Sequence, residues 1–109
     1  MPPHGPAERQ LVAYNARDID AFVACFTEDV VVEGALGEPI LKGREELRAQ
    51  YGAMFATYPE LHCEIVSRVH VGDFVLHEER ITGRKPEGEH AVAIYQVAGD
   101  LIRHVRFLR

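Results

Sequence analysis

Apolar residues recur at helical spacing in the first half of the chain and at strand spacing in the second half. Ala7, Leu11 and Tyr14 share one face of a helix predicted over residues 7–16. Asp18 can cap a second helix. The apolar stripe of that helix is made by Ile19, Phe22, Val23 and Phe26. Residues 27–29 are expected to end it, and the β-branched residues 30–32 predict the core of a strand.

A turn, a third helix and four further strands are predicted next. Residues 34–39 contain two glycines and a proline, which is typical of a turn. Gly43 begins the third helix, with Glu45 and Glu46 in the first turn where the helix dipole favours anions, and Pro59 ends it. The apolar period then becomes two, which predicts strands over residues 61–71, 74–82, 90–98 and 101–108.

This order of elements predicts an α+β fold. Helices come first and a run of antiparallel strands follows. We expect a cone-shaped, strongly curved, mixed or mostly antiparallel sheet, with three helices from the N-terminal half of the chain enclosing a pocket. At 109 residues, the chain is expected to form a single domain over residues 7–109 after a flexible lead-in of residues 1–6.

Composition excludes several classes of partner. The chain has 12 Lys and Arg against 17 Asp and Glu, so a nucleic-acid-binding surface is not expected. No apolar run is long enough to span a bilayer, and the first residues lack the pattern of a secretory signal, which favours a cytoplasmic protein. Cys25 and Cys63 lie in apolar segments without metal-ligand spacing and are predicted to be buried, reduced thiols.

Several segments together resemble one superfamily. They are Tyr14-Asn15-Ala16-Arg17-Asp18-Ile19-Asp20-Ala21-Phe22, Phe26-Thr27-Glu28-Asp29-Val30, Gly43-Arg44-Glu45-Glu46-Leu47, Tyr58-Pro59-Glu60-Leu61-His62 and Gly99-Asp100-Leu101-Ile102. The chain resembles the nuclear transport factor 2-like superfamily, in its SnoaL-like and steroid delta-isomerase-like branch. The resemblance is specific for the fold, and such folds host many unrelated activities.

The resemblance allows the isomerase mechanism to be compared residue by residue. In steroid delta-isomerases, a carboxylate at the end of the first strand moves a proton, and a tyrosine and a protonated aspartic acid stabilise the enolate oxygen. The resemblance places these three positions on Gly34, Gln10 and Tyr95, respectively. Both carboxylates are therefore missing, so the mechanism does not carry over directly. Tyr51 falls where the isomerases carry a supporting aromatic hydroxyl.

Strand alternation, oriented by the resemblance, predicts which side chains line the pocket. The inward-facing residues of the last three strands are expected to be Val75, His77, Glu79 and Ile81, then Ala91, Ala93, Tyr95 and Val97, then Ile102, His104, Arg106 and Leu108. Tyr14 and Tyr51 would approach from the helices. The catalytic candidates are Glu79, His77, Tyr95 and His104. The candidates for substrate contact are Tyr14, Tyr51, Arg106, Val75, Ile81, Ala93 and Ile102.

His77 and Glu79 form the strongest local pair because a carboxylate beside an imidazole can relay a proton. Burial would raise the pKa of Glu79, whereas a charged His77 would lower it. The alternative is that Glu79 forms a structural ion pair with His104 or Arg106. His104, Tyr95, Tyr51 and Arg106 each have a purely structural alternative as packing or rim residues. Glu33 is expected on the face opposite to Gly34, because only a bulge would turn it inward.

A metal site is the weaker chemical alternative. His77, Glu79 and His104 could supply three ligands, but the chain has no His-x-His or Cys-x-x-Cys spacing. His62 and His70 are expected to be exposed. The resemblance implies a family that usually works without metal, so neither a metal nor a cofactor is expected.

The opposite faces of the strands predict a homodimer. Five apolar residues are expected there: Phe74, Leu76, Leu101, Val105 and Phe107. An open sheet that leaves such residues in water is unusual for a monomer. Packing of two copies through their sheets would bury them, as the resemblance also implies.

Two main functions remain open. The first is a small cofactor-independent enzyme that isomerises, hydrates or hydrolyses a modest apolar, polyketide-like or steroid-like molecule by proton transfer. The second is a dimeric module that binds a small lipophilic ligand without chemistry. A weaker third is a protein-interaction dimer like the transport factor that names the superfamily.

Overall fold

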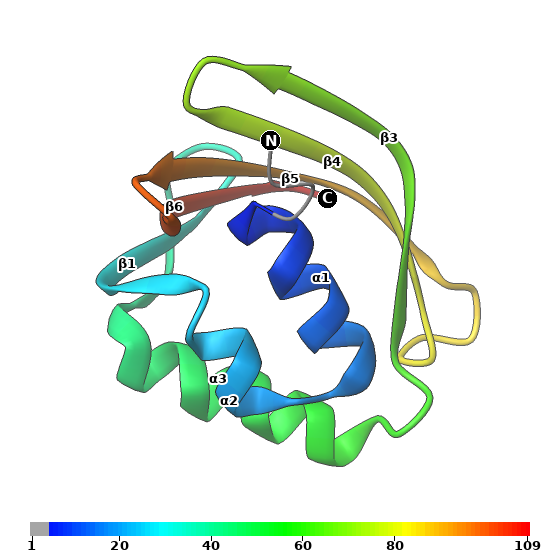
Figure 1. Cartoon of the computed structure of the whole chain (residues 1–109). Helices are drawn as coiled ribbons and strands as arrows, with labels where there is room; N and C mark the ends of the chain where they lie inside the picture. Colours follow the sequence, from blue (N-terminus) through cyan, green and yellow to red (C-terminus); the bar gives the residue numbers. More distant parts are fainter. Residues whose placement is uncertain (1–4) are drawn as a thin grey trace.

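The computed structural model describes residues 5–109, which form three helices and one sheet of six strands (Figure 1). The helices are α1 (Pro6–Ala16), α2 (Ile19–Val23) and α3 (Gly43–Thr57). The strands are β1 (Phe26–Gly34), β2 (Pro39–Lys42), β3 (His62–Val71), β4 (Phe74–Thr82), β5 (Glu89–Ala98) and β6 (Leu101–Leu108). Most of the predicted lead-in, residues 1–4, lies outside the described residues, and α1 begins at Pro6.

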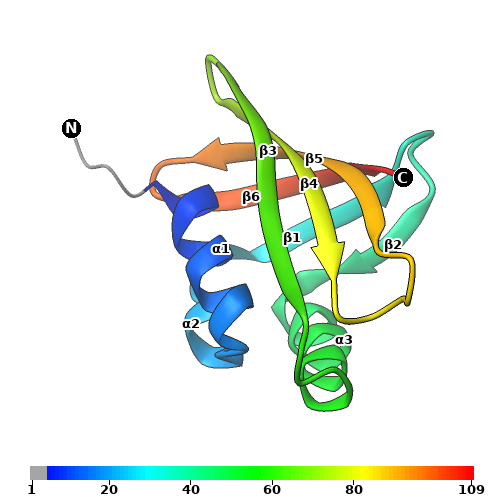
Figure 2. The ribbon, with the colours of Figure 1, turned by 90° about the vertical axis from the view of Figure 1, so that its right-hand side faces the viewer.

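The sheet is mixed and strongly curved. Its strand order is β2-β1-β6-β5-β4-β3, in which β1 and β6 are parallel and the other neighbours are antiparallel. Figures 1 and 2 show the sheet arching over α1, with α3 lying across the open end of the arch. The predicted α+β class and the curved sheet with three helices on its inner side are confirmed.

The turn between α1 and α2 follows the predicted capping chemistry. Arg17 ends α1 in the left-handed conformation, with φ of 54°, and its guanidinium donates a hydrogen bond to the carbonyl oxygen of Leu61. Asp18 then caps α2, since its carboxylate accepts a 3.2 Å hydrogen bond from the Ala21 amide.

The second helix is shorter than predicted. It ends at Val23, and residues 27–29 belong to β1 rather than to a helix terminus. The backbone of this segment pairs with the far end of the chain, because the Ile102 amide donates to the Cys25 carbonyl and Phe26 lies opposite Ile102 in the sheet. Phe26 is buried at the start of β1, and a helix continuing to this position would also have buried it. Its spacing from Ile19 therefore could not distinguish a helix from a strand. The short edge strand β2 was also missed, since Pro39 suggested a turn.

An irregularity in β6 reverses the expected faces of that strand. Val97 lies opposite Ile102, but the preceding residue Gln96 lies opposite His104, so Arg103 is an extra residue in β6. Such a bulge shifts the alternation by one position. Ile102 therefore faces inward as predicted, but the next inward residues are Val105 and Phe107 rather than those at positions 104, 106 and 108.

The helices meet the sheet through a cluster of aromatic rings. Phe22 is central to this cluster, with ring centroids 4.7 Å from Tyr51, 5.0 Å from Phe26 and 5.6 Å from Phe55. Tyr14 adds an edge-on contact to Phe55 at 5.5 Å. Rings at these distances and tilts pack favourably. The cluster holds α1, α2 and α3 together and forms one wall of the cavity described next.

Candidate functional site

A cavity of about 150 Å³ lies between the inner side of the sheet and the helices. Its walls are mainly apolar and aromatic. Its inner polar groups come from β3, β4, β5, α1 and α3: Cys63, Glu79, Tyr95, Gln10, Tyr14 and Tyr51. A concave apolar site with a few convergent polar groups is the usual form of a small-molecule site.

Glu79 is the carboxylate of this cavity and is almost fully buried, with 4% of its surface exposed. The Tyr95 hydroxyl donates a long hydrogen bond of 3.5 Å to its carboxylate, and the nearby Cys63 thiol also favours the ionised form. Burial raises the pKa of Glu79 to about 7, against the opposing effect of these donors and of the Arg109 charge. Near neutral pH the group can therefore either accept or donate a proton.

The phenols of the cavity are hydrogen-bond donors at physiological pH. Burial raises the pKa of Tyr51 to about 12 and raises the pKa values of Tyr14 and Tyr95 above their ordinary range. The pKa of the Cys63 thiol is raised to about 12 by burial and by Glu79. These side chains stay protonated, and Glu79 is the cavity group that titrates near neutral pH.

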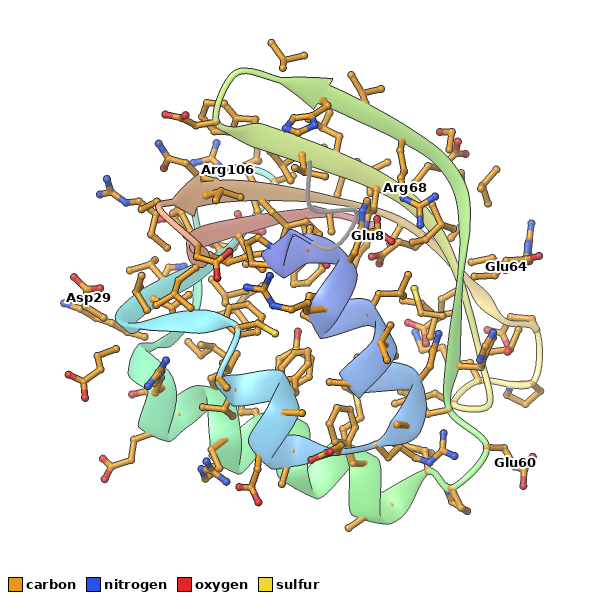
Figure 3. All side chains as sticks on the ribbon, in the orientation of Figure 1. Glu8, Asp29, Glu60, Glu64, Arg68 and Arg106 are labelled. Carbon is orange, nitrogen blue, oxygen red and sulfur yellow. The ribbon has the colours of Figure 1, made fainter. Side chains whose placement is uncertain are left out.

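His77 lies on the same strand face as Glu79 but outside the cavity wall. It is fully buried, its Nε2 lies 3.3 Å from Oε2 of Glu8 in α1, and its ring packs edge-on against Tyr95. Neither ring nitrogen has a well-aligned hydrogen-bond partner within residues 5–109. Burial lowers the pKa of His77, which favours the neutral ring, although Glu8 opposes this. Figure 3 shows Glu8 and Arg68 facing one another, and they form a bidentate ion pair of 2.6 and 2.9 Å.

The expected pairing of His77 with Glu79 is therefore not formed. The first turns of α1 cover the part of the inner face where His77 lies, and Glu8 is its nearest charged partner. A relay that passes directly from Glu79 to His77 has no hydrogen bond to carry it in the described structure.

His104 and Arg106 lie on the outer face of the sheet, contrary to the predicted inward orientation. Both bind Glu33 of β1, with 2.8 Å from His104 Nε2 and 3.0 Å from Arg106 Nη2 to the same carboxylate oxygen. Figure 3 shows Arg106 projecting from the sheet on the side away from α1. These two hydrogen bonds lower the pKa of Glu33. The bulge at Arg103 explains the reversal. The outward orientation expected for Glu33 is confirmed.

The structure divides the predicted substrate contacts into two groups. Tyr14, Tyr51 and Ile81 line the cavity. Val75, Ala93 and Ile102 belong to the inner face but are not part of the cavity wall, and Ala93 and Ile102 are completely covered by other residues. These three residues pack at the end of the arch that α1 covers, and the cavity lies toward the other end.

Two arginines at the cavity were missed. Arg84, in the loop between β4 and β5, forms a bidentate ion pair with Glu89, and its Nη1 lies 2.8 Å from the Met54 sulfur of α3. Arg109 follows β6, and its guanidinium carbon lies 4.6 Å above the Phe107 ring centre. A loop and a chain end carry no periodic signal, so the sequence pattern offered no way to place them.

The remaining sequence expectations are resolved in part. Cys25 and Cys63 are buried free thiols, as predicted. His62 and His70 are exposed, as predicted. Across the described part of the chain, no three His, Cys, Asp or Glu side chains are grouped to hold a metal ion. None of the helices in residues 5–109 has the length and apolar character needed to cross a membrane.

Solved structures of similar fold cover nearly the whole chain. An uncharacterised cystatin-fold protein from Novosphingobium aromaticivorans is 33% identical, with a TM-score of 0.88 and 95% of each chain covered. A putative polyketide cyclase from Sinorhizobium meliloti is 18% identical, with a TM-score of 0.79 and coverage of 94% of this chain and 92% of that one. A putative ketosteroid isomerase from Kribbella flavida is also 18% identical, with a TM-score of 0.79 and coverage of 94% and 73%.

Sequence comparison places the chain in a family. No curated protein is significantly similar to it. The model of the SnoaL-like domain matches residues 7–105, which include every helix and strand described here except for the ends of α1 and β6. The chain therefore belongs to the SnoaL-like domain family of the nuclear transport factor 2-like superfamily.

Proposed function

We propose that this protein is a small acid–base enzyme that moves a proton at carbon in a ring-sized apolar molecule. The observation that carries the proposal is Glu79, a carboxyl group buried in an apolar cavity with a pKa of about 7. A buried, perturbed carboxyl in a cleft is a frequent sign of general acid–base catalysis. The neighbours described as a putative ketosteroid isomerase and a putative polyketide cyclase support an enzyme of this family.

The proposed chemistry uses the two protonation states of Glu79 in turn. The ionised carboxylate takes a proton from a carbon next to a carbonyl group, and the electron pair of that C–H bond moves into the enolate. A phenol of the cavity, from Tyr95, Tyr51 or Tyr14, donates a hydrogen bond to the enolate oxygen. The protonated Glu79 then returns the proton to the same or another carbon, so that atoms and charge balance.

The size of the cavity limits the substrate. An apolar protein cavity of about 150 Å³ holds benzene, and the cavity here has the same volume. A compound with a single six-membered ring fits this space, so the part of a substrate that lies beside Glu79 is about one ring in size. We therefore place the substrate among monocyclic enolisable carbonyl compounds.

Carbon–hydrogen exchange tests this function directly. Cyclohexanone and 2-cyclohexenone are incubated with the protein in D₂O, and loss of the proton signal next to the carbonyl is followed by NMR. Exchange above the buffer rate that disappears in Glu79→Gln supports the enzyme. Glu64→Gln is the matched control, because Glu64 is an exposed carboxylate on the adjacent strand β3 (Figure 3).

The alternative is a binding module of the same fold. The observation that favours it is the separation of His77 from Glu79, which leaves the cavity with one group that titrates near neutral pH. A protonated Glu79 would then act as a hydrogen-bond donor to a bound carbonyl. Binding of cyclohexanone without any exchange would favour this module over the enzyme.

The homodimer remains a proposal, with a revised interface. Val105 and Phe107 line the cavity and cannot belong to the outer face. Leu76 and Phe74 of β4 do lie on that face, opposite Val69 and Val71 of β3. Phe74, Val69 and Val71 are 40%, 49% and 61% exposed, respectively.

A second copy of the chain is the occupant that this outer face fits. Acidic and basic groups, such as Glu33 and Arg106, accompany the apolar residues on it. A face that carries both signs of charge can complement itself across a twofold axis.

A further inference from the structure

The cavity has two arginines at its edge, and among the described residues only Arg84 is paired with a carboxylate side chain. The guanidinium of Arg84 donates two hydrogen bonds, of 2.6 and 2.7 Å, to the carboxylate of Glu89, and the two side chains form a bidentate ion pair. No ion pair joins Arg109 to an Asp or Glu side chain among the described residues, and its guanidinium carbon lies 4.6 Å from the centre of the Phe107 ring. Arg109 is exposed and also lines the cavity, so it lies at the opening.

The charge of Arg109 acts on titratable groups inside the cavity. It lowers the pKa of Glu79 inside the cavity and that of Glu89 at the rim, and it also acts on Tyr51. A guanidinium stacked on an aromatic ring is partly desolvated while its N–H edge stays open to a ligand. This cation is therefore placed to meet a negative group of a molecule that enters from the mouth.

The interior is suited to the uncharged part of such a molecule. The walls of the cavity include rings and aliphatic side chains: Phe22, Tyr51, Phe107, Val32, Leu47 and Ile81. The carboxyl group in the cavity is Glu79, whose raised pKa makes it less ionised near neutral pH than an exposed glutamate, so it repels an anion less. The volume of about 150 Å³ corresponds to one six-membered ring.

We infer that the natural ligand is a small carboxylate: a single ring that fills the cavity, with its carboxylate bound by Arg109 at the opening. The planar fork of an arginine matches the two oxygens of a carboxylate, and the resulting bonds are charge-assisted. This inference rests on the proposed function, since it places the ring of an enolisable substrate beside Glu79. It makes Arg109 the residue that selects acids over neutral compounds of the same shape.

Benzoate and benzamide are the probes for this inference, because they share the ring and differ in charge. Their dissociation constants are measured near pH 7 by ligand-observed NMR, together with that of acetate, which lacks the ring. We expect benzoate to bind at least about tenfold more tightly than benzamide, as a charge-assisted pair predicts. We expect acetate to bind much more weakly than benzoate, and high salt to reduce the preference for benzoate.

The matched variants are Arg109→Gln and Arg103→Gln. Both remove one positive charge, but Arg103 is an exposed residue at the bulge of β6 and does not line the cavity. Arg109→Gln should abolish the preference for benzoate, whereas Arg103→Gln should keep it. Equal affinities in the native protein, no binding of either ring probe, acetate binding as tightly as benzoate, or an unchanged preference in Arg109→Gln would each overturn the inference.

The exchange experiment separates this inference from the proposed function. Glu79-dependent exchange of a neutral ketone without any benzoate preference would overturn the carboxylate ligand and leave the enzyme standing. A benzoate preference that requires Arg109, without Glu79-dependent exchange of any ketone, would overturn the enzyme and support a carboxylate-binding module. Melting temperatures of both arginine variants close to that of the native protein would show that the fold is intact.

Discussion

The hydroxyl group of Tyr95 lies 3.5 Å from Oε2 of Glu79, and the two side chains face the same cavity from neighbouring strands. Each has 4% of its surface exposed. The phenol stays protonated, so it can only donate to the carboxylate. Catalytic hydrogen bonds are often long in empty sites and shorten when the substrate binds. This pair is the basis of the predictions on proton transfer.

Removal of the Glu79 carboxylate should abolish exchange and preserve the fold. Because a positioned general base contributes about 100-fold or more, Glu79→Gln should lower the exchange rate by at least that factor. Glu64→Gln should exchange at the native rate. The rates are compared by NMR and the folds by circular dichroism. An active Glu79→Gln variant would show that another group removes the proton.

Glu79 should also make the protein less stable as the pH rises. Its pKa in the folded state is about 7, above its ordinary value of 4.5, so the folded state holds this proton more tightly than the unfolded state. The stability that this proton contributes is fully present below about pH 4.5 and is lost as the pH rises to about 7. The difference between these two pKa values corresponds to about 3 kcal/mol in the free energy of unfolding.

Glu79→Gln isolates this effect, because the titration of His77 is common to both proteins and cancels in their difference. Chemical denaturation at pH 5 and pH 8 should show that the variant gains stability relative to the native protein at the higher pH. A constant difference in the free energy of unfolding across this range would mean that Glu79 titrates normally.

The pH profile of exchange should report the contact with Tyr95. If ionised Glu79 is the base, the exchange rate rises with pH and reaches half its maximum near pH 7. Tyr95→Phe removes a donor that favours the ionised form, so the midpoint should move to higher pH. An identical midpoint in Tyr95→Phe would show that the 3.5 Å contact has no effect on the carboxyl group.

His104 should be dispensable for exchange. Its imidazole is bonded to Glu33 on the outer face, so it does not reach the cavity. His104→Gln is expected to keep the native exchange rate and pH midpoint. Loss of exchange in His104→Gln, with an intact fold, would contradict the assignment of the site to the inner face of the sheet.

The outer face should mediate dimerisation. Leu76→Lys places a charge in the middle of the apolar residues on β3 and β4, so it should convert a dimer into a monomer or an aggregate. Size-exclusion chromatography with light scattering measures the mass. Thr82→Lys, a matched change at the exposed end of β4, should leave the mass unchanged. A native protein that stays monomeric at micromolar concentration would rule out the dimer.

Local rules predicted the parts of the site that depend on neighbouring residues in the chain. Asp18 caps a helix because its side chain reaches an amide three residues later. Glu79 and Ile81 face the cavity because strict alternation holds along β4. The same alternation along β1 correctly directs Glu33 outward.

Long-range packing decided the rest. The bulge at Arg103 arises where β6 pairs with β5, and it turns His104 outward and Val105 inward. No glycine or other local signal marks this position in the sequence. His77 is excluded from the cavity by α1, which lies some 70 positions earlier in the sequence.

The sequence by itself determined the class of fold and the order of the elements other than β2, because caps, turns and alternation act over a few residues. Alternation placed Glu79 on one face with His77 and Ile81, and the family resemblance identified that face as the inner one. Tertiary structure alone decided that Glu79 is separated from His77, that Phe26 begins a strand, and that Arg109 meets the cavity mouth. These outcomes depend on register and close packing between distant segments, which no local pattern encodes.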